Sequence, residues 1–259
     1  DQLLQSHHLN EHERFLLNIV HKNVAVLLRL VNQILDFRKF EDGKLQLRLS
    51  QFDLHASLLE WADAFRTLSF RKHIHFQIDA DADTDFTVTA DAEKLERIVY
   101  NLLSNSFKFT PENGQISMHL SSCTKNGEPA VRLQVTDTGV GMPAEHVRHI
   151  FDSFYQIDVH HAGSGIGLAL VKAFVEMHHG TISVDTTEGQ GTCFTIEIPA
   201  CQSGMLDPDT TRSAVLTNLK EGAVLAADQE TLQAVAPEST PDDKETCLLY
   251  TSPSPRDTR

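Results

Sequence analysis

The segment Asn101–Thr110 carries three polar side chains on one stripe of an otherwise apolar helix. Asn101 and Asn105 are four residues apart and Lys108 follows three residues later, which is the spacing of neighbours on a helix surface. A buried amide without a hydrogen-bond partner costs on the order of 1–3 kcal/mol. The stripe is therefore expected either to face water or to contact a ligand.

The motif "DTGVGM" favours the second alternative. Asp137 stands at the end of a predicted strand, with Gly139 and Gly141 directly behind it. Glycine lets the backbone approach a flat ligand closely, because no Cβ stands in the way. The carboxylate can accept a hydrogen bond there, and the exocyclic amine of a nucleobase would supply one.

Further glycines predict a phosphate site. "GSGIGL" places Gly163, Gly165 and Gly167 at the start of a helix, where free N–H groups and the positive helix end favour anions. Gly189 and Gly191 form a tight turn before a strand. The complete Walker and dinucleotide-binding glycine patterns are both absent from the sequence.

Periodicity and turn residues predict the elements that must position these groups. Helices are expected over residues 10–40, 53–71, 92–109 and 166–179, with a short one after Pro143. We expect Asp91 to cap the third helix and Gly180 to close the fourth. Strands are expected over residues 44–49, 73–79, 86–91, 115–122 and 130–137, followed by a hairpin over 181–199. This mixed order predicts an α+β fold, a two-layer sandwich with helices on one face of the sheet.

The first helix has the seam of a helix that pairs with another helix. Its apolar positions alternate in steps of four and three: Leu16, Val20, Leu27, Leu30, Ile34 and Phe37, with Asn23 on the same seam. The pattern favours a helical bundle over a core helix of a globular domain. Asn10 with Glu13 forms a predicted capping box, and Gly43 a predicted stop.

Composition limits the function classes. The 259-residue chain has a formal charge of -14, which argues against nucleic acid as a partner because duplex binding needs a basic surface. Its four cysteines, at positions 123, 193, 201 and 247, lack a metal-binding or disulfide pattern, as expected for reduced thiols. Beyond Pro199 an acidic segment predicts a linker or disordered tail, with residues 248–259 read as non-native sequence.

Taken in order, the asparagine stripe, "DTGVGM", "FDSFYQ", "GSGIGLAL" and "GQGTCF" closely resemble the N, G1, F, G2 and G3 boxes of histidine kinases. The resemblance is closest to hybrid two-component sensor kinases of the Bacteroides type. It implies the Bergerat ATP-binding fold, shared with gyrase, Hsp90 and MutL, preceded by a long dimerisation helix. The implied domains are a partial dimerisation domain over 1–44, a catalytic domain over 45–200 and a tail over 201–259.

The resemblance also implies a role for each matching position. Asn105 would hold Mg²⁺, Asn101 would lie beside it near the phosphates, and Lys108 would contact phosphate. Asp137 would bind the adenine amine. The residues that would shape the adenine pocket or clasp the phosphates are Gly139, Gly141, Thr192, Gly163, Ser164, Gly165, Ile166, Gly167 and Leu168. Phe151 and Phe154 would anchor the mobile lid.

Asn101 bears on which reaction is expected. Related ATPases resemble this site but carry a glutamate here to activate water, and a neutral amide cannot act as a general base. A histidine nucleophile is largely a free base near pH 7. The implied reaction is therefore transfer of the γ-phosphoryl group of Mg·ATP to a histidine on the dimerisation domain, for relay to an aspartate of a response-regulator receiver domain. The expected setting is a homodimer in the cytoplasmic portion of a membrane-anchored sensor, with no membrane contact by this part.

Two departures from the family keep alternatives open. The H-box, a histidine followed by an acidic residue and Arg-Thr-Pro, is absent, so this chain is expected to lack its own phosphoacceptor. The lid segment has only His160 and His161 as cations near the γ-phosphate. The alternatives are an ATPase of the same fold and a non-catalytic nucleotide-sensing or dimerisation module.

Overall fold

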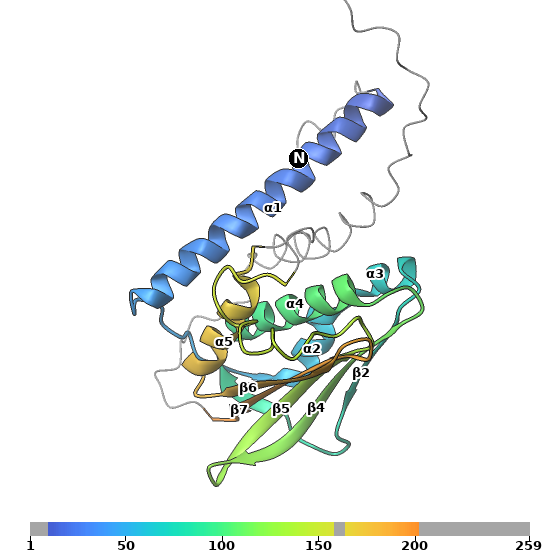
Figure 1. Ribbon diagram of the computed structural model, residues 1–259. Helices are drawn as coiled ribbons and strands as arrows, with labels where there is room; N and C mark the ends of the chain where they lie inside the picture. Colours follow the sequence, from blue (N-terminus) through green and yellow to red (C-terminus); the bar gives the residue numbers. More distant parts are fainter. Residues whose placement is uncertain (1–9, 158–163, 202–259) are drawn as a thin grey trace, which may run out of the picture.

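The computed structural model describes residues 10–157 and 164–201, and it has two layers, a sheet with helices on one face (Figure 1). The main sheet has five strands in the order β2-β4-β5-β7-β6. These strands are β2 His75–Ala80, β4 Gln115–Lys125, β5 Glu128–Asp137, β6 Thr181–Thr187 and β7 Gly191–Pro199. β2 runs parallel to β4 and the other pairs are antiparallel. The predicted α+β sandwich is confirmed.

A second, two-stranded sheet joins β1 Ser50–Asp53 to β3 Thr87–Ala90 in antiparallel register. The predicted strand over 44–49 is wrong for most of its length, because β1 begins at Ser50. The reason is a tertiary contact: the backbone N–H of Arg48 donates to the carboxylate of Asp91 at 2.8 Å. The Asp91 side chain thus accepts the hydrogen bond that a neighbouring strand would otherwise accept from Arg48.

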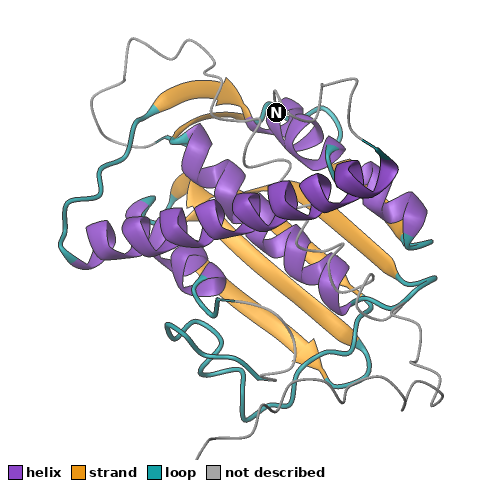
Figure 2. Cartoon of the chain, turned by 90° about the horizontal axis from the view of Figure 1, so that it is seen from above, coloured by secondary structure: helices purple, strands orange, loops and turns teal. Residues whose placement is uncertain are grey.

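The helices are α1 Glu11–Glu41, α2 Leu54–Asp63, α3 Arg66–Arg71, α4 Ala92–Phe109 and α5 Gly167–Met177. Seen from above, they cross the strands of the sheet (Figure 2). The helix predicted over 53–71 is two helices, and Phe65 between them is fully buried and stacks on Phe107 with ring centroids 5.4 Å apart. The break therefore brings Phe65 into the core. Residues after Pro143 form turns rather than the expected short helix.

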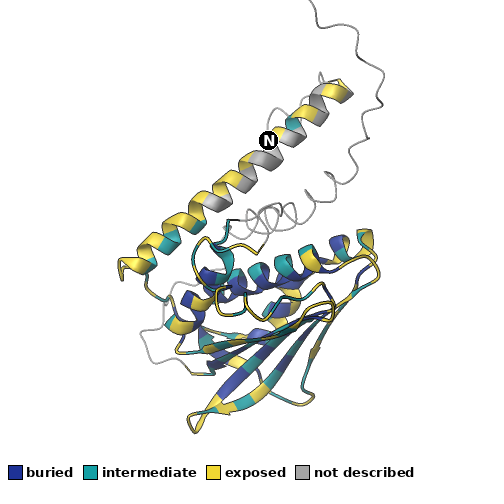
Figure 3. Cartoon of the chain, in the orientation of Figure 1, coloured by how far each residue is buried: buried dark blue, intermediate teal, exposed yellow. Residues whose placement is uncertain are grey.

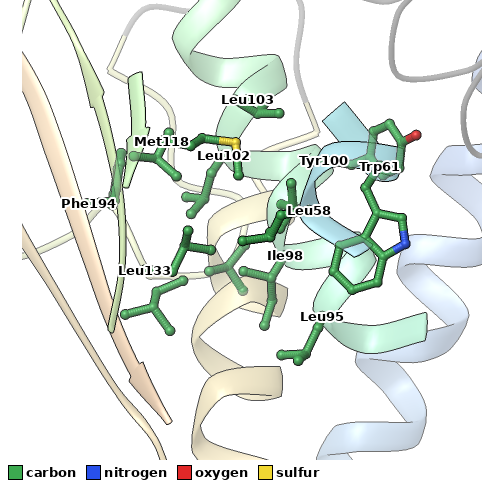
Figure 4. Close-up of a cluster of buried hydrophobic side chains, with 14 of the residues drawn as sticks. Leu58, Trp61, Leu95, Ile98, Tyr100, Leu102, Leu103, Met118, Leu133 and Phe194 are labelled. Atoms are coloured by element: carbon green, nitrogen blue, oxygen red, sulfur yellow. The ribbon is translucent and has the colours of Figure 1, made fainter. Parts of the chain in front are cut away.

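The core lies between the helices and the sheet. α2 and α4 contribute Leu58, Trp61, Leu95, Ile98 and Leu102, and the strands contribute Met118, Leu133 and Phe194 (Figure 4). Each fully buried side chain of this size stabilises the fold by roughly 1.5–3 kcal/mol relative to exposure. Because α4 repeats with a period of 3.6 residues, burying this stripe leaves the side with Asn101 and Asn105 only half-buried.

α1 extends away from the two layers and has a largely exposed surface (Figures 1 and 3). Of the predicted seam, Leu16, Val20, Leu27 and Ile34 are between 44% and 60% exposed, while Phe37 packs against the core. The side chains of Asn23 and Leu30 lie outside the described part. No helix in the described part of the chain combines the length and hydropathy that a membrane-spanning segment requires.

The start of α4 is held by a buried network around Asp91. The Asp91 side chain caps the helix by accepting from the N–H of Lys94 at 3.1 Å, and it pairs with the Lys94 ammonium at 2.6 Å. Its own backbone N–H donates to Nε2 of His178 at 3.1 Å, while Nδ1 of His178 donates to the carbonyl of Phe174 at 2.7 Å. His178 is therefore neutral, and its burial lowers its pKa below the ordinary value of 6.5.

The end of α5 differs from the expected glycine stop. The residue in the left-handed conformation is His179, with φ of +54°, not Gly180. A Cβ at position 180 would lie 2.7 Å from the carbonyl oxygen of Glu197, so glycine is needed there for close packing against β7.

The neutral state of His178 predicts an acid-side loss of stability. As pH falls through about 6.5, His178 of the unfolded chain takes up a proton while buried His178 does not, so the free energy of unfolding decreases towards lower pH. Urea unfolding between pH 5 and pH 7.5 measures this slope. We expect His178→Gln to have a lower free energy of unfolding at pH 7.5 and a shallower dependence of that free energy on pH.

Exposed His179 is the matched control, because it adjoins His178 on the same chain segment. His179→Gln should retain the wild-type slope. Equal slopes of unfolding free energy against pH for wild type and His178→Gln would contradict the assignment of neutral His178 in the folded protein.

Candidate functional site

α4 carries the asparagine stripe on the side turned away from the core. Asn101 donates from its side-chain amide to the carbonyl of Arg97 at 2.8 Å. This bond fixes the amide so that Oδ1 points outward, where a Cβ placed on Gly167 would lie 2.9 Å from it. Asn105 is half-buried, and its side chain makes no hydrogen bond to a described residue. Lys108 is also half-buried, with Nζ 5.0 Å from the centroid of the Phe109 ring.

The Asp137 carboxylate lies at the end of β5 and is only 6% exposed. Oδ1 accepts from the backbone N–H of Gly139 at 2.9 Å, and Oδ2 accepts from the hydroxyl of Ser106 at 3.1 Å. Burial raises the pKa of Asp137, while the hydrogen bonds from Gly139, Ser106 and Thr192 act against that rise. The carboxylate is thus held in place by three protein donors, and because an ionised carboxylate has about four lone-pair sites it can accept from a fourth.

Sequence reasoning missed Ser106. It is 2% exposed on the buried side of α4, between Leu103 and Phe107. A hydroxyl on a buried helix face needs a partner, and that requirement was the available signal. The identity of the partner depends on how α4 packs on β5, which the sequence does not state.

Two glycines let three backbone segments meet beside Asp137. At Gly141, with φ of +63°, a Cβ would lie 2.0 Å from the carbonyl oxygen of Thr187. At Gly191, with φ of +109°, it would lie 2.0 Å from the carbonyl oxygen of Asp137 itself. The loop after β5 therefore packs directly on the β6–β7 turn, and the predicted role of glycine in close backbone approach has a structural basis.

Thr192 lies opposite Asp137 in the β5–β7 register and is 8% exposed. Its hydroxyl is 3.1 Å from the hydroxyl of Thr186, which donates to the carbonyl of Gly191 and accepts from the N–H of Met142. The threonine pair therefore closes the side of the site formed by β6 and β7.

The residues before α5 lie against α4 and α1. Gly163 and the pair His160 and His161 lie outside the described residues. Ser164 donates to Oε1 of Gln33 at 3.1 Å, and Gly165 accepts from the N–H of Phe154 at 2.8 Å. Ile166 is buried, and Gly167 and Leu168 form the first turn of α5, which has no side-chain cap. Helix N–H groups at this end are available for an anion.

The two phenylalanines of the "FDSFYQ" motif have different environments. Phe151 packs edge-on to Phe194 of the core, with ring centroids 6.5 Å apart. Phe154 is 64% exposed, has φ of +65°, and contacts Phe37 of α1 at 6.4 Å. Phe151 thus anchors the segment to the sheet, whereas Phe154 links it to α1.

An ion pair also joins α1 to α4. Arg97 pairs with Asp36 of α1 and, at 2.7 Å, with Glu93 one turn earlier on α4. The side chains of Arg97 and Asp36 are largely buried. Together with the Gln33 and Phe37 contacts, this pair holds the end of α1 beside the start of α5.

α4 connects these positions, because it contacts one group after another along its length. Ser106 near its end contacts Asp137, and Asn101 one turn and a half earlier lies against Gly167. The site therefore offers a buried hydrogen-bond acceptor at one end, amide oxygens in the middle and a helix N-terminus at the other. This arrangement suits an elongated ligand with an amine at one end and negative charge at the other.

Comparison with known proteins identifies the family of this domain. Residues 90–202 match the model of the histidine kinase-, DNA gyrase B- and HSP90-like ATPase family. The chain contains a histidine-kinase-type ATPase domain. The chain is 32% identical over 227 residues to circadian input-output histidine kinase CikA of Synechococcus elongatus, covering 86% of this chain and 29% of that protein. It is 37% identical over 186 residues to sensor histidine kinase TmoS of Ectopseudomonas mendocina, covering 70% of this chain and 18% of TmoS.

Solved histidine kinases have the same fold. Full-length ShkA, solved in complex with AMPPNP, superposes with a TM-score of 0.66 at 28% identity, over 78% of this chain and 42% of ShkA. The catalytic domain of histidine kinase ThkA superposes with a TM-score of 0.53 at 27% identity, over 59% of this chain and 96% of that domain. The chain spans between 13% and 29% of the length of the first curated relatives that it matches.

The close approach at Gly191 predicts that this domain tolerates alanine poorly there. We expect Gly191→Ala to lower the free energy of unfolding by about 3 kcal/mol or more, since both the backbone conformation and the contact with Asp137 must change. Urea denaturation followed by circular dichroism measures the loss.

Gly189 is the matched control in the same turn, with φ of +76° and no atom within 4 Å of an added Cβ. Gly189→Ala should cost only the left-handed backbone penalty of about 1–2 kcal/mol. Equal losses for the two variants would show that the contact is unimportant.

Proposed function

We propose that this chain is the ATP-binding catalytic region of a two-component sensor histidine kinase, joined to part of its dimerisation domain. The observation that carries the proposal is the placement of Asp137, Asn101 and the start of α5 along the length of α4. The family match supports ATP as the ligand, and the relatives support a histidine as the phosphoryl acceptor.

Adenine fits the end of the site at Asp137. Its exocyclic amine would donate to the buried carboxylate, which already accepts from Gly139, Ser106 and Thr192. An ionised carboxylate has about four lone-pair sites, so a fourth donor can be accommodated. Gly139, Gly141 and Thr192 would form the walls of the adenine pocket.

The phosphates fit the other end. The segment from Gly163 to Leu168 would bind them through helix N–H groups, and Lys108 would contribute a positive charge. Asn105 would hold Mg²⁺ through its amide oxygen, because its side chain has no described hydrogen-bond partner. Mg²⁺ keeps several waters and takes few protein ligands when phosphates supply the rest, and bound metal would neutralise charge on the transferred phosphoryl group.

The fixed amide of Asn101 favours transfer to a protein over hydrolysis. Its N–H bonds to Arg97, and a neutral amide offers no base to activate water. The imidazole of an acceptor histidine needs no such base near pH 7. An ATPase of the same fold and a non-catalytic nucleotide sensor remain the alternative functions.

The wider assembly follows from α1. Its exposed apolar positions, including Leu27 and Ile34, would pair with a second copy in a homodimer. The division into a dimerisation part over 1–44, a catalytic domain over 45–200 and a tail over 201–259 is part of the proposal. The phosphoryl group would then pass to a receiver domain of a response regulator, in the cytoplasmic portion of a membrane-anchored sensor.

Nucleotide binding tests the role of Asp137. We expect Asp137→Asn to weaken ATP binding by roughly tenfold to a hundredfold, since a charge-assisted hydrogen bond is lost. Isothermal titration calorimetry measures this, with Asp185→Asn on an exposed position of β6 as the matched control. Unchanged affinity in folded Asp137→Asn would remove adenine from this end of the site.

Phosphoryl transfer in trans tests the reaction. With γ-labelled ATP and Mg²⁺, the chain should label a separately supplied dimerisation domain that carries an H-box histidine. We expect Asn105→Ala to abolish labelling and Asn126→Gly, in the remote β4–β5 turn, to retain it. Steady ADP release without labelled protein would instead identify an ATPase, and binding with neither result would identify a sensor.

A further inference from the structure

β2 is an edge strand of the main sheet, beneath α3, and no strand of the described residues pairs with its outer edge (Figure 1). The N–H of His75 donates to the carbonyl of Gly114, directly before β4, at 2.9 Å, and the N–H of Asp81 donates to Leu120 of β4 at 3.0 Å. Because strand residues alternate in direction, Phe76, Ile78 and Ala80 turn their backbone N–H and C=O groups away from β4. Such a row of hydrogen-bonding groups is a template for another strand.

A hollow of about 730 Å³ adjoins this edge. It is lined by Leu59 of α2, Phe70 of α3 and the residues of β2 from His75 to Ile78. Phe70 is 81% exposed, the highest value among the exposed large apolar side chains of the described residues. Exposed aromatic groups beside open backbone groups indicate an interaction surface.

The outer face of β2 has a pattern of polar side chains that is complementary to itself. His75, Gln77 and Asp79 are exposed and joined in sequence, with His75 bonded to Gln77 at 3.3 Å and Gln77 to Asp79 at 3.1 Å. In an antiparallel pair centred on Gln77, His75 of each copy would lie opposite Asp79 of the other. An imidazole N–H can donate to a facing carboxylate, and a polar or oppositely charged pair at facing positions stabilises a strand pair, whereas like charges destabilise it.

We propose that the β2 edge is a self-association surface, where two copies of this chain pair antiparallel through β2 with Gln77 opposite Gln77. In this register Phe76 faces Ile78 of the other copy, so the residues with outward backbone groups meet and exchange hydrogen bonds. The two-fold axis is perpendicular to the sheet, which places both helical layers on the same side. Phe70 of each copy then faces the hollow of the other copy across the paired β2 strands.

The opposite edge of the sheet lacks these features. β6 exposes Thr181, Ser183 and Asp185 on its outer face. Self-pairing centred on Ser183 would place Thr181 opposite Asp185, without a cation. The β2 surface is also separate from α1, so this association adds to any pairing of α1 and does not depend on the proposed kinase activity.

Disulfide trapping tests the register in the full chain, with Cys123, Cys193, Cys201 and Cys247 replaced by serine. Gln77 would occupy a non-hydrogen-bonded pair, where the Cα atoms are about 4.5 Å apart, within the range of a disulfide. We expect Gln77→Cys to form a covalent dimer under mild oxidation. Ser183→Cys, exposed at the middle of the opposite edge, is the matched control and shares the same α1.

Equal cross-linking of Gln77→Cys and Ser183→Cys would overturn the proposal. The same result is expected if the β2 edge binds a strand of another protein and not a second copy of this chain. A charge exchange gives an independent test by sedimentation. Asp79→Arg should weaken self-association by roughly twofold to thirtyfold, from two symmetry-related pairs worth about 0.2–1 kcal/mol each. His75→Asp combined with Asp79→Arg should restore it, and failure to restore it in a folded double variant would also overturn the proposal.

Discussion

The buried carboxylate of Asp91 is the contact on which the site geometry depends. It caps α4, pairs with Lys94 and accepts the N–H of Arg48, while its backbone N–H reaches His178 at the end of α5. Asp91 thus connects the segment before β1, the start of α4 and the end of α5. Removing one partner of a buried charged pair leaves the other unsatisfied, at a cost of about 3–5 kcal/mol.

This contact sets the relative position of the two helices that line the site. α4 and α5 pack against each other on the sheet, and Asp91 joins the beginning of one to the end of the other. The start of α5 therefore falls beside Asn101 rather than elsewhere along α4. At the far end of α4, Ser106 meets Asp137, so the distance between the two ends of the site is fixed by the length of one rigid helix.

Local signals predicted α4 and its polar stripe well. Asp91 caps the helix as expected, and Pro111 follows its last residue, Phe109, by two positions. The turn between β4 and β5 is likewise local, because Asn126 and Gly127 both have positive φ and this residue pair is typical of a two-residue hairpin turn. These features depend on residues close in the sequence. By contrast, the strand predicted over 44–49 was wrong because a carboxylate 43 residues away accepts the N–H of Arg48.

The site shows the same difference between features set by local sequence and features set by contacts between distant residues. Asp137 and its glycines were predicted because a strand end followed by close glycines is a local pattern. The contact of Ser106 with Asp137 was missed, and so was the left-handed backbone conformation of His179 beside Gly180. Both depend on packing between elements that are distant in the sequence. The roles assigned to Asn105 and Lys108 rest on the resemblance and on their stripe, since helical spacing places side chains on one side but does not identify a ligand.

Near its end, α1 contacts the rest of the molecule through one stripe of described side chains. Gln33, Asp36 and Phe37 are spaced by three and four residues, so all three face the same way. They provide one hydrogen bond, one ion pair and one aromatic contact. Contacts of these kinds contribute about 0.5–3 kcal/mol each, far less in total than the burial of the core. Because all three lie on one stripe, a rotation of α1 about its axis would separate them together, and with them the link between this helix and the residues before α5.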